Sequence, residues 1–169
     1  MEENKNLEEG SIENKEMKSW EDKMTWAWAI TIPIMLIMYS GMILGKPFVP
    51  MEVMPIVLLI LGFPVIFIIG WSTIKQGLRG FYTFYFSMDS LIALGTIIAY
   101  LTGILSFFGF ADYSGVSSMI MTIFITGKYI ESRAKGKASQ EIKKLLQLGA
   151  KKARIIRDKS EIEVDISEL

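Results

Sequence analysis

Long apolar stretches alternate with short charged segments along this chain. Three uncharged runs of 22 residues each occupy 24–45, 53–74 and 90–111, and about 20 apolar residues are needed to cross the hydrocarbon core of a bilayer. A fourth run, 113–127, has 15 uncharged residues. Lys128 can extend its ammonium group to the interface, so this run can also reach the required length. The pattern predicts an α-helical membrane protein with four transmembrane helices in two hairpins.

The segments outside these runs differ in character. Residues 1–23 are polar and acidic and lack an apolar core behind a basic start, which excludes a cleaved signal peptide. We expect a flexible cytosolic tail there. Beyond the fourth run, apolar residues at helical spacing up to Gly149 predict a cytosolic helical stalk. The alternation of polar and apolar residues in 161–166, after the apolar pair in 154–157, predicts a small β-hairpin.

The second run contains helix-breaking residues. Two prolines and two glycines interrupt it, and past Trp71 it continues with Lys75 and Arg79 among apolar residues. We expect a bend near Gly70, followed by an amphipathic segment on the membrane surface.

Charge predicts the orientation. The termini and the segment from Lys75 to Asp89 carry seventeen of the eighteen basic residues, and Lys46 stands alone on the other side. By the positive-inside rule, both termini and the middle loop are cytosolic, in a multi-pass protein of the plasma membrane. The basic run from Arg133 to Lys159 has no interleaved aromatic residues, so it favours contact with anionic lipid and not nucleic acid.

The residue types limit the chemistry. The chain contains neither Cys nor His, which excludes disulfides, Cys/His zinc sites and nucleophiles paired with imidazole. A metal ligand must therefore come from Met, a carboxylate, a hydroxyl or the backbone.

Two residues at predicted helix ends are candidate ligands. Glu131 is a carboxylate at the end of a membrane helix, where a charge costs free energy unless it is solvated, paired with a base or used to bind a ligand. Because Arg133 and Lys135 are close in sequence, an interfacial charge without a ligand explains it equally well. Met88 begins the third helix, and its soft thioether suits copper(I) better than a hard cation, although Met also commonly fills gaps between helices.

The stretches from Met88 to Thr96 and from Gly127 to Lys137 carry a family resemblance. They resemble the first core transmembrane hairpin of heavy-metal P-type ATPases, especially the copper(I) exporters. The resemblance implies that 24–80 holds two preliminary helices, 88–131 the first core hairpin, and 132–169 the stalk and an incomplete actuator domain. Gly115 is a departure, because it replaces a Glu that is often found in copper exporters.

The resemblance also implies roles for individual residues. Met88 and Glu131 would form a transient site through which copper(I), the transported ion, enters the membrane. A surface platform that receives a soluble copper carrier would correspond to Gly70, Lys75, Gly77 and Arg79. In the family that platform starts at a glycine pair, and Ile69 and Gly70 stand at those positions here.

The family's phosphorylation motif and nucleotide site are not in this sequence. We therefore expect no ATP hydrolysis by these residues alone, and ATP and Mg²⁺ would act only in a full-length pump, whose remaining domains join in cis or in trans. A stand-alone four-helix protein that regulates a metal pump or carrier is the alternative. A membrane anchor without a metal role is a third reading.

Overall fold

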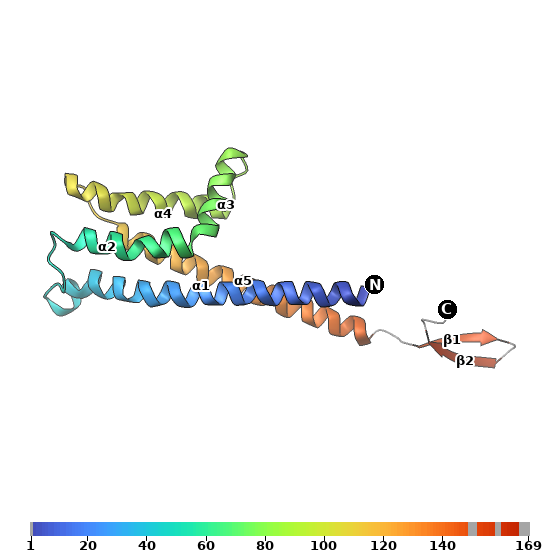
Figure 1. Ribbon diagram of the computed structural model, residues 1–169. Coiled ribbons are helices and arrows are strands. Elements are labelled where there is room, and N and C mark those ends of the chain that lie inside the picture. The colour runs from blue at the N-terminus through green and yellow to red at the C-terminus, as the bar shows by residue number, and fades with distance from the viewer. Residues whose placement is uncertain (1, 149–151, 158–159, 166–169) are drawn as a thin grey trace.

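The computed structural model describes residues 2–148, 152–157 and 160–165, with side chains described for 12–142. The chain is mostly helical (Figure 1). In order, its elements are α1 (Glu2–Leu44), α2 (Met54–Phe63), a π-helical turn η1 (Pro64–Ile69), α3 (Trp71–Tyr82), α4 (Met88–Leu105), a 3₁₀ turn η2 (Ser106–Phe108), α5 (Ser114–Leu148), β1 (Lys152–Arg157) and β2 (Ser160–Asp165).

Two described helices are long and apolar enough to cross a membrane. They are the stretch Ile12–Leu44 of α1 and the stretch Met88–Phe108 of α4 and η2; the pair Met54–Ile69 and Trp71–Tyr82 makes a third if it is counted as one broken span. This supports a multi-pass membrane protein. The fourth predicted span lies in the first half of α5, which passes no such test and stays a prediction.

The expectation of a flexible tail does not hold for residues 2–23, because α1 begins at Glu2 and runs without interruption into the membrane stretch. Glu and Lys are good helix formers. A seam with spacings of three and four residues also continues back from the membrane stretch through Met24, Trp20 and Met17, which are all partly buried. The tail is therefore the first part of a single long helix.

α1 and α5 pack side by side and antiparallel (Figure 1). Near the middle, the hydroxyls of Thr31 and Thr122 are hydrogen bonded at 2.7 Å and fully buried, and the Trp28 indole donates to Thr126 Oγ1 at 3.0 Å. Ser139 Oγ donates to Glu13 Oε1 at 2.7 Å. The pairing thus extends from the membrane stretch into the predicted tail and stalk.

The bend expected near Gly70 is present. The helices on its two sides differ in direction by 71°. Pro64 begins a π-helical turn, which closes when the Gly70 N–H donates to the Val65 carbonyl at 2.9 Å. A Cβ at Gly70 would lie 2.7 Å from the Ile66 oxygen and 2.8 Å from Met121 Sδ. Only glycine fits this corner without displacing its neighbours.

α3 crosses the start of α4 through its small residues. Its buried face consists of Thr73, Ile74, Gly77 and Gly80. A Cβ at Gly77 would overlap Ala93 Cβ, and one at Gly80 would overlap Ser90 Oγ. This close contact fixes the α3 face that meets α4, and it leaves the opposite face, with Lys75 and Arg79, exposed.

The two strands lie where the sequence predicts a β-hairpin. They are antiparallel, with Ile155 opposite Ile162. Their assignment to an actuator domain remains a prediction, and the predicted helix stop at Gly149 lies outside the described residues.

Candidate functional site

Met88 is the first residue of α4, and its side chain is largely exposed, at 68%. Ser87 precedes the helix in an extended conformation, and its N–H donates to Ser90 Oγ at 3.3 Å. This local cap stops the chain from continuing α3 and sets the direction in which α4 starts. The thioether therefore lies at the end of the helix and not within the packed core.

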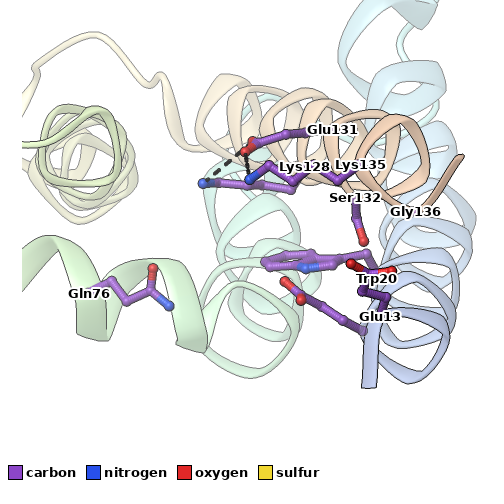
Figure 2. Close-up of a pocket in the computed structure, with 9 residues that line it drawn as sticks. Glu13, Trp20, Gln76, Lys128, Glu131, Ser132, Lys135 and Gly136 are labelled. Carbon is purple, nitrogen blue, oxygen red and sulfur yellow. Dashed lines mark hydrogen bonds and ion pairs between the residues drawn. The ribbon is translucent and has the colours of Figure 1, made fainter. Parts of the chain in front are cut away.

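Glu131 lies on α5 and is held by two lysines of the same helix. Lys135 Nζ donates to Oε1 at 2.6 Å, and Lys128 Nζ lies 3.9 Å from Oε2 (Figure 2). The spacings i,i+4 and i,i−3 put all three side chains on one face. The Glu131 side chain is half exposed, at 50%, so it is open to solvent despite its partners.

These contacts shift the ionisation of the pair. The hydrogen bond from Lys135, followed by the charges of Lys128 and Lys135, lowers the pKa of Glu131 from its ordinary 4.5. The same hydrogen bond and the charge of Glu131, with a smaller effect of Glu16, raise the pKa of Lys135 from its ordinary 10.5. Glu131 is therefore a carboxylate at neutral pH and cannot offer a proton.

The structure brings Met88 and Glu131 to the same groove. The groove has a volume of about 450 Å³ and lies between the start of α4 and the middle of α5. Its other lining residues are Ile92, Ile120, Ile123, Phe124, Gly127 and Lys128. The walls are mostly apolar, so the thioether and the carboxylate are the chemically distinctive groups, together with one ammonium.

A second, more polar cavity of about 290 Å³ shares Lys128 and Glu131 with this groove. Figure 2 shows Glu131 and its two lysines on one side of it, with Trp20 and Glu13 of α1 on the other and Gln76 of α3 at the margin. The sequence does not predict the contribution of α1, because an acidic segment without an apolar run favours a flexible tail. The seam through Met17, Trp20 and Met24 is the signal that would have revealed it.

Lys128 and Asp89 are the other residues whose part in the site the sequence did not reveal. Lys128 lines both cavities, its Nζ is 3.4 Å from Asp89 Oδ1, and it lies 5.4 Å from the centre of the Phe124 ring. The Asp89 side chain is 15% exposed. Among the residues that the structure describes, no group of three or more acidic side chains is arranged to hold a metal ion.

The four platform residues separate into two pairs. Gly70 and Gly77 are buried at the bend and at the contact with α4. Lys75 and Arg79 are exposed and line an open groove on α3 with Trp71, Leu78 and Tyr82. Only the basic pair is therefore accessible to a partner or to lipid.

Comparison with known proteins gives a consistent set of relatives. The chain is 35% identical over 147 residues to a probable copper-importing P-type ATPase A of Enterococcus hirae, covering 83% of this chain and 20% of that protein. It is 36% identical over 107 residues to a probable copper-exporting P-type ATPase V of Mycobacterium tuberculosis, covering 63% and 14%. It is 31% identical over 157 residues to a copper-exporting P-type ATPase of Staphylococcus epidermidis, covering 88% and 20%.

The chain thus spans about one fifth of the length of the curated relatives it matches over most of its own length. No protein-family model matches it.

Proposed function

This chain corresponds to an N-terminal portion of a copper-transporting P-type ATPase, and on that premise we propose that it forms the cytosolic access site through which copper(I) enters the membrane. One observation carries the proposal. Met88 from α4 and Glu131 from α5 line the same groove, although the two residues are remote in sequence.

The chemistry of the two groups suits a transit site. A thioether is a soft ligand that favours copper(I) over magnesium or calcium, and a carboxylate adds negative charge. Two such ligands give weak, exchangeable binding, because tight sites usually surround the ion with three or four donors. Weak binding of this kind allows the ion to leave the site for the next one along its path.

The placement in the membrane is part of the proposal. Both termini and the α3–α4 connection lie in the cytosol, the first part of α5 is the fourth span, and the host membrane is the plasma membrane. The positive-inside distribution of Lys and Arg supports this orientation. Transport proceeds outward; the relatives include proteins described as exporting and as importing, so direction is a point to test.

A second proposed feature is a docking surface on α3. The 71° bend turns α3 out of line with α2, and Lys75 and Arg79 lie exposed beside Trp71 and Tyr82. Such a face suits a membrane surface and a soluble copper carrier with acidic groups. ATP and Mg²⁺ would act on other domains of the pump, joined in cis or in trans.

Copper(I) competition against a chromophoric chelator tests the access site. The full chain in lipid nanodiscs is compared with Met88→Leu and Glu131→Gln, and each substitution is expected to weaken binding at least about threefold. Met42→Leu and Glu52→Gln are matched controls, since both residues are exposed and neither lines the groove. Equal binding by all five proteins would refute the proposed site.

A further inference from the structure

A lysine stands inside the groove that holds the two proposed ligands. Lys128 lines this groove together with Met88 and Glu131, and it also lines the polar cavity. Its Nζ lies 3.9 Å from Glu131 Oε2, and its side chain is 27% exposed. A positive charge therefore already occupies the position next to the carboxylate that an incoming cation would need.

The same ammonium has a second acidic neighbour on another helix. Asp89 Oδ1 lies at 3.4 Å, closer than Glu131 Oε2, and Asp89 follows Met88 directly at the start of α4. This oxygen is shielded from solvent and accepts no hydrogen bond from the described residues. A largely buried carboxylate with an unused acceptor is costly unless a cation stays beside it. Asp89 can therefore keep Lys128 when Glu131 releases it.

We infer that Lys128 is a resident counter-cation of the access site, that an incoming copper(I) ion displaces it from Glu131, and that Asp89 holds the displaced ammonium. This inference rests on the proposed function. It adds a selectivity mechanism to that function, because only a cation that also binds the Met88 sulfur can displace the Lys128 ammonium from Glu131.

The charge balance supports the exchange. Before the ion binds, the lysine ammonium lies between two carboxylates. After binding, the monovalent metal pairs with Glu131 and Met88, and the ammonium pairs with Asp89, so neither carboxylate is left without a cation. Lys135, the other partner of Glu131, is 73% exposed and can move into solvent toward Glu16, which already raises its pKa.

A double-mutant cycle on Lys128 and Asp89 tests the inference by copper(I) competition in nanodiscs. Lys128→Gln is expected to tighten binding about three- to tenfold, because Glu131 loses its competing cation. Asp89→Asn is expected to weaken it about threefold, because the ammonium is left with Glu131 alone. In the Lys128→Gln background, Asp89→Asn is expected to have no further effect, since it acts through the lysine.

The controls separate this effect from simple changes of net charge. Lys137→Gln removes the same charge further along α5, from an exposed residue that lines neither cavity, and should leave the affinity unchanged. Lys128→Arg retains the charge and should bind as weakly as the native chain. Where Lys128→Gln fails to fold, Lys128→Leu removes the same charge among the mostly apolar walls of the groove and should tighten binding to a similar degree.

Each result is decisive. No tightening by Lys128→Gln, or equal tightening by Lys137→Gln, overturns the inference. If Asp89→Asn weakens binding in both backgrounds, Asp89 is a metal ligand and not a holding partner, which also overturns it. Failure of the proposed function is seen separately, as native-like binding by Met88→Leu and Glu131→Gln.

Discussion

Gly77 determines how closely α3 can approach the start of α4, and its replacement by Ala is expected to disturb both helix packing and the proposed access site. The Cβ added by Gly77→Ala would overlap Ala93 Cβ and lie 2.7 Å from the Asp89 backbone oxygen, well inside the 3.4 Å at which ordinary contact begins. Neither neighbour is the flexible end of a side chain, so one helix must move.

The size of the effect follows from two opposing terms. Overpacking of this kind costs about 1–3 kcal/mol. Replacing Gly by Ala inside a helix returns about 0.5–1 kcal/mol through backbone entropy. The net destabilisation therefore lies between about 0 and about 2.5 kcal/mol, and relative to a glycine replaced by alanine without a clash it is about 1–3 kcal/mol. Because the clash falls on Asp89, the Lys128–Asp89 pair should also lengthen, and binding of copper(I) should weaken.

The assay is reversible unfolding in mixed micelles, followed by helical circular dichroism. Gly95→Ala is the matched control, because Gly95 also lies within a helix and its Cβ would meet nothing within 4 Å. We expect Gly95→Ala to leave stability unchanged or to raise it. If Gly77→Ala is as stable as Gly95→Ala, the packing argument for α3 on α4 is refuted.

Three further predictions concern the contacts around the site. Because the pKa of Glu131 is lowered, its ion pair stabilises the fold above pH 4.5, and this contribution is lost as the pH falls through the folded-state pKa. A carboxyl ¹³C titration should find the Glu131 midpoint below 4.5 in the native chain and closer to 4.5 in Lys135→Gln. Thr31→Val removes a buried 2.7 Å hydrogen bond to Thr122 and should destabilise the fold by about 1 kcal/mol in the same unfolding assay. Thr122→Val should cost less in the Thr31→Val background than in the native chain, because the hydrogen bond is already lost. Trp20→Ala should separate the first part of α1 from α5 and increase amide hydrogen exchange there; unchanged exchange would contradict the packing of the long helix.

The apolar runs predict the two helices that are long and apolar enough to cross a membrane and the broken pair that can form a third span, because lipid imposes a minimum length and an apolar composition on each span. The bend at Gly70 was also predictable, since a proline and a glycine interrupt one run. In contrast, residues 2–23 are helical, and α5 packs against the partly buried side chains from Glu13 onward. The composition of such an acidic segment predicts flexibility. Only the helical spacing of Met17, Trp20 and Met24 indicates that this part of α1 packs against another helix.

Met88 and Glu131 were proposed as ligands because the surrounding sequence resembles that of copper P-type ATPases, since a thioether or a carboxylate at a helix end is equally compatible with packing or an interfacial charge. Their common groove was not deducible from spacing, because it depends on how α4 and α5 pack. The same limit applies to Lys128. In the sequence it is a lysine that ends a membrane run, and only the fold reveals that its ammonium lies between acids of two helices.

The most direct test of the access site is silver(I) titration of the chain with ¹³C-labelled methionine methyl groups, followed by NMR. Silver(I) is a redox-stable stand-in for copper(I), and the Met88→Leu variant assigns the Met88 signal among the eleven methionines. We predict that the Met88 methyl signal shifts at the lowest silver(I) concentrations, and that Glu131→Gln moves this response to higher concentrations. A Met88 signal that stays in place while other methionines respond, or one that responds equally without the Glu131 carboxylate, would contradict this prediction.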